Sequence, residues 1–438
     1  MKSHINCGPL RVRAQRLVTG AFLLFSAFAF SAANDARAAE AAFAQWLASL
    51  WPEAQAIGVS RATFEAATRG LEPDFSLPDL AVPGRPEAAQ PAQPEFVQTP
   101  ADYLRESTIA RLAAQGAKLH EQYRAALDGI EKRFGVPGNV VLAIWGRETD
   151  FGNYRLPHNA IRVLATQAYV GKRRDMFRKE FLLALKMLED GVRLADMRSS
   201  WGGAMGLTQF LPSEFYKYAV DFDGDGRADI WNSVPDALAS AAKQLAEKGW
   251  QPGERWGYEV HAPSRFDCTL GVPEVVRPIG EWLKAGFVPA YGRKLSAGEL
   301  AEGASVVQPE GIYGPSFLAT KNYFVIKEYN FSDLYVLFVG HVSDRIGDAR
   351  RFETPWSQTA IMRTADAEAM QKTLAAQGLY QDKIDGKAGM KTRAALGAYQ
   401  KQNGLKLDCW PSGAVLSHMR ANGGRTTGAG DAGKEGAR

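Results

Sequence analysis

The chain has 438 residues, of which 46% are hydrophobic and 23% are charged, so it is long enough for two domains and has the composition of a globular protein. The formal net charge of +4 resides in the first 38 residues, where five basic residues accompany one acidic residue, and the remainder is close to neutral. A near-neutral protein argues against nucleic-acid binding.

The first 38 residues have the features of a secretory signal peptide. Basic residues precede an uncharged apolar run from Leu17 to Ala33, and Ala36-Arg37-Ala38 fits a cleavage site. The run is short for a membrane span and rich in Ala and Ser, so a permanent membrane helix is the less favoured alternative. No cysteine follows the run where a lipoprotein needs one, because Cys7 precedes it. We therefore expect a soluble periplasmic protein.

Two cysteines, Cys268 and Cys409, remain after this segment. An oxidising compartment permits a disulfide between them. They fall in regions that we assign to different domains, and two free, partly buried thiols are the alternative.

The next part of the chain is mainly helical in pattern. Apolar residues recur at helical spacing over residues 39–69, 103–134, 160–169 and 173–190. Residues 72–100, rich in Pro and Ala, interrupt this rhythm and predict an irregular linker or an extended strap.

The stretch from Val136 to Gly152 predicts a buried helix that carries a carboxylate near its end. Every residue from Val140 to Trp145 is apolar, and the closing glycine offers a stop. Glu148 lies on a face that buried residues share, and burial and the helix dipole both oppose its ionisation. We expect a raised pKa for Glu148, as a general acid requires. The alternative is a structural glutamate paired with Arg147.

A glycine-rich segment follows at residues 200–218. Gly202, Gly203 and Gly206 allow a close approach of the backbone to a ligand or to another element. Gln209 stands between apolar neighbours, so this turn is either a binding loop or a site of tight packing. The Pro212-Ser213 pair then predicts the start of a new helix.

Residues 221–229, DFDGDGRAD, place oxygen ligands at alternate positions, as a calcium loop does. Asn232 occupies the position of the usual bidentate glutamate, and Asp236 could replace it. The predicted metal set is Asp221, Asp223, Asp225, Arg227, Asp229 and Asp236. We expect modest affinity and a structural role, with a metal-free surface loop as the alternative.

Residues 251–322 contain frequent Gly and Pro and short β-like runs, such as Ser305–Val307 and, just beyond them, Tyr323–Ile326. A small β-containing subdomain fits this pattern, and Asn330–Ile346 is helical again. Two further helices, Asp366–Gln377 and Thr392–Gln402, predict a compact C-terminal module. The tail from Ala421 should be disordered.

Two families resemble this sequence. Residues from about 40 to 350 resemble the lytic murein transglycosylase B family of periplasmic enzymes with a lysozyme-like core. The matching motifs are QPEF (93–96), GRETDFG around Glu148, LATQAY (164–169), the arginine pair 173–174, GGAMGLTQFLPS (202–213), DFDGDG (221–226) and EYNFSD (328–333). Residues of about 362 to 420 resemble the common peptidoglycan-binding module through AMQKTLAAQGLY, IDGKAG and KTRAALGAYQ. Cys409-Trp410-Pro411 departs from the usual ending of that module.

The resemblance implies a role for individual residues. Glu148 matches the single catalytic glutamate, and the acidic loop matches a structural calcium site. The residues that match the substrate-binding positions are Ser200, Gln209, Tyr329, Asn330, Arg173 and Arg174. A salt bridge is the alternative role for the two arginines.

A site with one carboxylate suits a reaction in which the substrate supplies the nucleophile, because ordinary glycosidases use two. We find no second candidate, since Asp150 points elsewhere on a helix. Glu148 would protonate the glycosidic oxygen between N-acetylmuramic acid and N-acetylglucosamine. It would then deprotonate the muramyl 6-hydroxyl, leaving a 1,6-anhydromuramyl end. A hydrolytic muramidase and a non-catalytic wall-binding scaffold are the alternatives.

These observations predict a mainly α (α+β) protein: a lysozyme-like helical catalytic domain with a small β-containing subdomain, and a three-helix peptidoglycan-binding domain. The expected segments are the signal peptide 1–38, the catalytic domain 39–355 (calcium loop 221–236, β-containing subdomain about 251–327), the linker 356–361, the module 362–420 and the tail 421–438. Expected partners are peptidoglycan glycan strands, without nucleic acid or a stable membrane span, for a monomer that needs no cofactor for catalysis. If the module tethers the enzyme to the wall, its deletion should weaken binding to sacculi and spare turnover of short soluble fragments.

Overall fold

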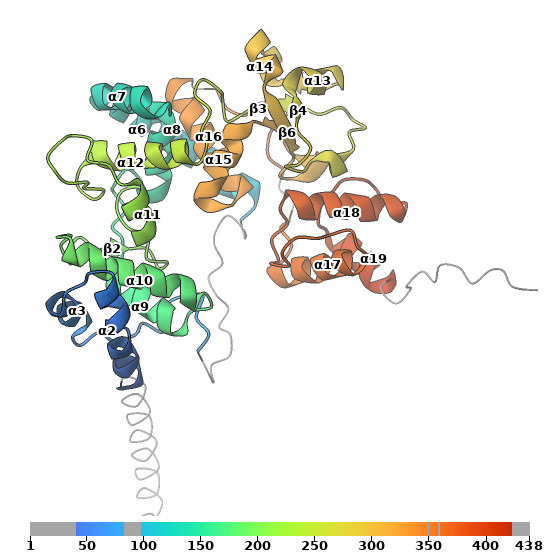
Figure 1. Ribbon diagram of the computed structural model, residues 1–438. Coiled ribbons are helices and arrows are strands. Elements are labelled where there is room, and N and C mark those ends of the chain that lie inside the picture. Colours follow the sequence, from blue (N-terminus) through green and yellow to red (C-terminus); the bar gives the residue numbers. More distant parts are fainter. Residues whose placement is uncertain (1–40, 83–97, 349, 358–359, 423–438) are drawn as a thin grey trace, which may run out of the picture. The chain divides into compact units, whose positions relative to one another are not determined.

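The computed structural model describes residues 41–82, 98–348, 350–357 and 360–422, and the proposed signal peptide lies outside this part. The chain divides into two compact units (Figure 1). Of the described residues, the first unit contains 41–82, 156–205 and 211–213, and the second contains those in 98–155, 206–210 and 214–422. No helix among the described residues is long and apolar enough to cross a membrane.

The first unit is built around two adjacent helices. Its elements are a helix over residues 41–49, α2 (Trp51–Ala56), α3 (Arg61–Thr68), β1 (His158–Asn159), α9 (Ala160–Val170), α10 (Arg174–Glu189) and β2 (Arg198–Ser199). α10 packs along α9, and α2 and α3 pack against α10. The described residues 72–82 contain no helix and lie on α9, where Arg162 Nε donates to the Glu72 carbonyl and Gln167 Nε2 to the Pro78 carbonyl. The QPEF motif lies outside the described residues.

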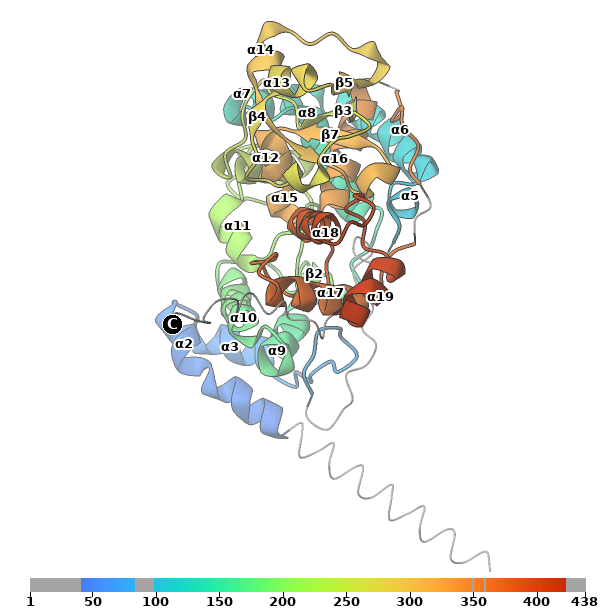
Figure 2. The ribbon, with the colours of Figure 1, turned by 90° about the vertical axis from the view of Figure 1, so that its right-hand side faces the viewer.

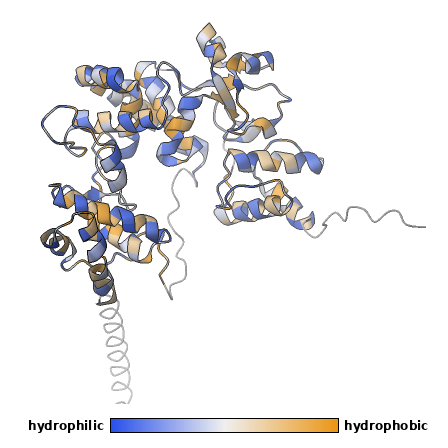
Figure 3. Ribbon diagram, in the orientation of Figure 1, coloured by the Kyte–Doolittle hydropathy of each residue, from blue (hydrophilic) through white to orange (hydrophobic). Residues whose placement is uncertain are grey.

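The helical part of the second unit surrounds one buried helix. Its elements are α5 (Pro100–Tyr103), α6 (Glu106–Gln122), α7 (Arg124–Phe134), α8 (Gly138–Thr149), α11 (Pro212–Tyr218, which begins in the first unit), α12 (Val234–Glu247), α15 (Lys321–Asn330) and α16 (Asp333–Gly347). α8 packs against α6, α7, α12 and α16. Residues 140–146 are all buried, which confirms that this helix runs through the core. In Figure 3 most other helices carry both apolar and polar residues, as helices with one buried face do.

A five-stranded antiparallel sheet follows in the second unit (Figure 2). The strand order is β4-β6-β7-β3-β5, with β3 (Gly257–His261), β4 (Arg277–Pro278), β5 (Val288–Pro289), β6 (Gly303–Val307) and β7 (Ser316–Ala319). The connecting helices are α13 (Ile279–Lys284), α14 (Ala297–Ala301) and the 3-10 turns η1 (Cys268–Leu270), η2 (Ala290–Gly292) and η3 (Gly311–Tyr313). A second apolar cluster centred on Trp282 fills the space between the sheet and α13.

The structure confirms the strand at Ser305–Val307 and corrects two assignments nearby. Tyr323–Ile326 is part of α15 and not of a strand, because three of its four residues enter the main core of helices. Asn330 ends α15 and does not begin the next helix. Phe331 has a φ of 58°, and the side chain of Ser332 then caps the new helix by accepting from Leu334 N.

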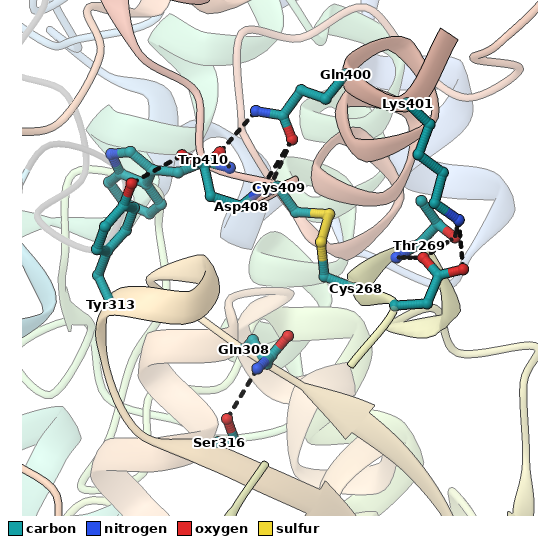
Figure 4. The surroundings of a disulfide bond; sticks show 11 residues. Cys268, Thr269, Gln308, Tyr313, Ser316, Gln400, Lys401, Asp408, Cys409 and Trp410 are labelled. Atoms are coloured by element: carbon teal, nitrogen blue, oxygen red, sulfur yellow. Dashed lines mark hydrogen bonds and ion pairs between the residues drawn. A yellow bond between two sulfur atoms is a disulfide. The ribbon is translucent and has the colours of Figure 1, made fainter. Parts of the chain in front are cut away.

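The C-terminal module consists of α17 (Thr364–Ala376), α18 (Met390–Gln402) and α19 (Gly413–Asn422) around its own apolar cluster. The third helix extends through Asn422, so the first two residues of the expected tail are helical, and residues 423–438 lie outside the described part. A disulfide joins Cys409 of the module to Cys268 of η1 (Figure 4). The two cysteines are therefore bonded to each other and are not two free thiols.

Candidate active site

Glu148 lies in the last turn of α8, half-buried. The helix ends earlier than the expected stop at Gly152, because Asp150 already has a φ of 52°. Phe151 (φ 56°) and Gly152 (φ 81°) continue in the left-handed region, and Phe151 packs edge-on against Trp145. These residues turn the chain away directly after Glu148 and fix the end of the helix.

A tyrosine from α16 binds the Glu148 carboxylate. Tyr335 Oη donates to Glu148 Oε1 over 2.6 Å. Burial raises the pKa of Tyr335 well above its usual range, and the charge of Glu148 raises it further. Tyr335 therefore stays protonated at any physiological pH and acts as a fixed donor.

Tyr329 of α15 lies parallel to Tyr335, with 6.2 Å between the ring centroids and 9° between the ring planes. Its Oη donates to the Thr208 carbonyl over 2.8 Å. Burial, and then the charges of Glu148 and Glu214, raise the pKa of Tyr329 well above its usual range. Two neutral tyrosines from consecutive helices thus stand side by side at the Glu148 carboxylate.

The segment 206–210, the end of the glycine-rich turn, is fixed next to α8. Thr149 Oγ1, one residue beyond Glu148, donates to the Leu207 carbonyl over 2.7 Å. Gln209 has a φ of 60°, uncommon for a residue other than glycine, and its Nε2 donates to the Gly206 carbonyl. Strained backbone of this kind is frequent at ligand sites.

Asn330, the last residue of α15, has a buried amide oxygen without a hydrogen-bond partner among the described residues. A buried hydrogen-bond acceptor without a donor lowers the stability of the folded protein, unless a ligand or a water molecule donates to it. Glu148, Gln209, Tyr329 and Asn330 all belong to the second compact unit.

Arg147, which the sequence offered as an ion-pair partner of Glu148, contacts aromatic residues. Its Nη2 donates to Tyr103 Oη over 2.7 Å, and its guanidinium lies 4.6 Å from the Tyr103 ring centroid and 4.9 Å from that of Phe338. Arg147 therefore anchors the end of α8 to α5 and α16.

Two other carboxylates, those of Asp150 and Glu214, are candidates for a second catalytic carboxylate beside Glu148. Asp150 forms an ion pair with Arg111 over 2.7 Å. Glu214 accepts from Gln244 Nε2 over 2.9 Å, and its charge acts on Tyr329. Glu214 was not among the residues singled out from the sequence.

Three of the predicted substrate-binding residues belong to the first unit. Ser200 is half-buried in a turn, where its Oγ accepts from Ala204 N. Arg173 forms an ion pair with Asp79 over 3.2 Å, which is the alternative role considered for it, and Arg174 is exposed at the start of α10.

The acidic loop gathers three of the predicted metal ligands. Oxygen atoms of Asp221, Asp223 and Asp236 lie within 4.8 Å of one another. Asp225 and Asp229 do not belong to this group of three, and they accept from the backbone N–H groups of Arg227 and Trp231 respectively. Asp236 is fully buried.

Sequence reasoning missed Tyr335 and Asp333. The signal was present, since both lie in or just after the EYNFSD motif, within six residues of Tyr329. Asp333 is buried at the start of α16, where Tyr323, Lys327 and Arg393 bind its carboxylate.

Comparison with known families matches residues 42–344 to the transglycosylase SLT domain and residues 363–418 to the putative peptidoglycan binding domain. Membrane-bound lytic murein transglycosylase B of Escherichia coli (strain K12) is 28% identical over 244 residues. That match covers 54% of this chain and 64% of the relative, less than two thirds of its length.

Solved structures agree with this placement. SltB3 from Pseudomonas aeruginosa, in complex with NAG-NAM-pentapeptide, has a TM-score of 0.76 and 35% sequence identity, covering 86% of this chain and 99% of that chain. SltB1 from the same organism has a TM-score of 0.55 and 26% identity, covering 70% and 99%. The expected lysozyme-like helical fold with a small sheet is thereby confirmed.

Proposed function

Because this chain belongs to the transglycosylase SLT domain family of peptidoglycan lytic transglycosylases, we propose that it cleaves the β-1,4 bond between N-acetylmuramic acid and N-acetylglucosamine and leaves 1,6-anhydromuramyl ends. The observation that carries this proposal is the hydrogen bond from Tyr335 to Glu148, which orients one half-buried carboxyl group at the end of a core helix.

Glu148 acts first as a general acid and then as a general base. Because Tyr335 donates to Oε1, Oε2 carries the proton that passes to the glycosidic oxygen. The resulting carboxylate then accepts the proton of the muramyl 6-hydroxyl, whose oxygen forms the bond to the anomeric carbon. The substrate supplies the nucleophile, so no water is consumed.

Among the described residues, most other candidate carboxylates are engaged elsewhere, which supports this route over hydrolysis. Asp150 pairs with Arg111, and Asp221, Asp223 and Asp236 gather in the acidic loop. Glu214 is the remaining candidate for a second catalytic carboxylate, because its charge acts on Tyr329. A substitution at Glu214 therefore distinguishes a reaction with one carboxylate from a reaction with two.

The predicted substrate-binding residues complete the proposed site. The unpaired amide oxygen of Asn330 suits an N–H or hydroxyl donor of an amino sugar, and the strained Gln209 and the Tyr329 ring lie in the same unit. Ser200, Arg173 and Arg174, which lie in the first unit, remain predicted substrate-binding residues.

The test is mass spectrometry of the muropeptides released from purified sacculi by the parent protein and by Glu148→Gln and Glu214→Gln. We expect anhydromuramyl products from the parent and from Glu214→Gln, and a loss of about 100- to 10,000-fold in Glu148→Gln. Products with an added water, lost in both variants, would identify a two-carboxylate muramidase. No products from the parent, with binding to sacculi retained, would identify a scaffold protein.

The acidic loop is the proposed site of a structural calcium ion. Its three converging carboxylates provide the hard oxygen donors that calcium prefers, and no catalytic step depends on the ion. Calcium at 100 times its dissociation constant should stabilise the folded protein by about 2.7 kcal/mol. The thermal midpoint should rise with calcium in the parent and not in Asp223→Ala. Equal midpoints with calcium and with EDTA in the parent would exclude the site.

Export to the periplasm is proposed from the N-terminal segment and is supported by the disulfide, which requires an oxidising compartment. N-terminal sequencing of the protein from a periplasmic fraction should find a start after residue 38. Recovery of the uncleaved chain in the membrane fraction would contradict the proposal.

A further inference from the structure

The C-terminal module contacts the rest of the second unit through one face of α18 and through the segment that follows it, where Asp408 accepts from Tyr313 Oη over 2.8 Å. Met390, Arg393, Gly397 and Lys401 recur at helical spacing and all point to this interface. Met390 is part of the main hydrophobic core, which also contains Tyr335. The module therefore packs against the helices of the second unit and is not connected to them by the chain alone.

Covalent and close contacts fix the middle of this face. The disulfide between Cys409 and Cys268 lies beside α18, and a Cβ at Gly397 would overlap Cys409 Sγ. Lys401 forms an ion pair with Asp267, and Figure 4 shows Lys401 beside Thr269, the residue that follows Cys268 of the disulfide. Such close backbone approach leaves α18 no room to shift.

The first half of the face reaches the active-site helices through one buried ion pair. Arg393 Nη2 donates to Asp333 Oδ2 over 3.1 Å, and their side chains are only 11% and 8% exposed. The other oxygen of Asp333 accepts from Lys327 Nζ over 2.6 Å and from Tyr323 Oη over 3.0 Å. Although burial opposes it, the charges of Lys327 and Arg393 hold the pKa of Asp333 well below its usual range.

Asp333 occupies the point where two active-site helices meet. It is the first residue of α16, two residues before Tyr335, and Lys327 lies on α15, one turn before Tyr329 and Asn330. The bonds of Asp333 therefore hold the end of α15 against the start of α16 across the left-handed Phe331. Tyr335 and Asn330 therefore lie within three residues of Asp333 in the sequence.

We propose that the C-terminal module is a structural part of the active site, in which Arg393 is a positioning residue that acts through Asp333 on Tyr329, Asn330 and Tyr335. Deleting the module removes Arg393, Met390 and Cys409 together. Such a deletion therefore impairs turnover of short soluble fragments as well as binding to sacculi, contrary to the behaviour of a simple tether.

The test measures kcat and KM on a short soluble glycan fragment, binding to sacculi, and the thermal midpoint for each variant. Arg393→Ala should lower kcat by about 10- to 100-fold, with KM and sacculus binding close to those of the parent. Arg393→Lys, which keeps the cation, should recover most of kcat. Lys401→Ala, which removes a more exposed ion pair of the same interface, is the matched control and should keep the parent kcat.

Asp333→Asn covers the case in which Arg393→Ala does not fold, because it leaves no unpaired carboxylate in the interface. Asp333→Asn should also lower kcat. The double variant, which combines Arg393→Ala with Asp333→Asn, should have a kcat only slightly lower than that of either single variant. A parent-like kcat in a folded Arg393→Ala or in Asp333→Asn would overturn the proposal. Equal losses of kcat in Arg393→Ala and Lys401→Ala would also overturn it.

This inference rests on the proposed function, but the two fail differently. If the parent releases no anhydromuramyl products, the proposed reaction is wrong. If the parent is active and Arg393→Ala is equally active, only the role of Arg393 is wrong.

Discussion

The disulfide between Cys268 and Cys409 should contribute strongly to stability, because it closes a long loop. The two cysteines are 141 residues apart in the sequence. Removing the cross-link with C268S/C409S frees a loop of that length in the unfolded chain, and the entropy regained lowers the free energy of unfolding by up to about 5 kcal/mol. The unfolded chain also becomes less compact, so the slope of unfolding against denaturant should increase.

Urea denaturation of the oxidised parent and of C268S/C409S measures this effect. The fluorescence of Trp410, next to Cys409, contributes to the signal from the module, and circular dichroism follows all helices. Peptide mapping should first confirm the bond, because Cys7 adds a third thiol to the full chain. Both sulfurs belong to buried residues, so reductant under native conditions should act slowly. Equal midpoints for the two proteins, or free thiols at both positions in oxidised parent, would refute the reasoning.

Three further predictions follow from single contacts. Tyr335→Phe removes a charge-assisted hydrogen bond to Glu148, worth about 1.5–3 kcal/mol, and should lower kcat by about 10- to 150-fold in a soluble-fragment assay; an unchanged kcat would contradict it. Burial, and then the charge of Arg345, lower the pKa of His341 to about 3, so the unfolded chain binds a proton there below pH 6.5 that the folded chain does not. The free energy of unfolding should therefore fall as the pH decreases, and its slope should be steeper in the parent than in His341→Phe by about 1.4 kcal/mol per pH unit. Urea titrations at pH 4 to 7 measure both slopes, and equal slopes for the two proteins would contradict the prediction. Gly206→Ala should lower stability by about 2 kcal/mol or more, because φ is +75° and the new Cβ would lie 2.8 Å from Ile230; an unchanged thermal midpoint would contradict this.

The sequence predicted those elements whose cause is local. An unbroken apolar run is buried on every side of a helix, so α8 and its passage through the core ahead of the half-buried Glu148 were predictable. The same local reasoning placed Ser305–Val307 in a strand. It was wrong for Tyr323–Ile326, where β-branched and aromatic residues entered α15 because the core of packed helices outweighed their local preference.

Contacts between distant residues were not predictable in the same way. Tyr335 is 187 residues from Glu148, and the spacing of apolar residues says nothing about which tyrosine binds a given carboxylate. The same holds for Arg393, whose partner Asp333 lies 60 residues away in the sequence. The pairing of Cys268 with Cys409 depended on how the module docks, which no local pattern specifies.

The docking of α18 also determines the geometry with which the enzyme meets its substrate. A binding module on a flexible linker can attach anywhere within the reach of that linker, and its effect depends on linker length. Here a disulfide, a buried ion pair and a core methionine hold the module in one position on the second unit. The separation between the module and Glu148 is therefore set by the fold of the second unit and not by the length of a linker.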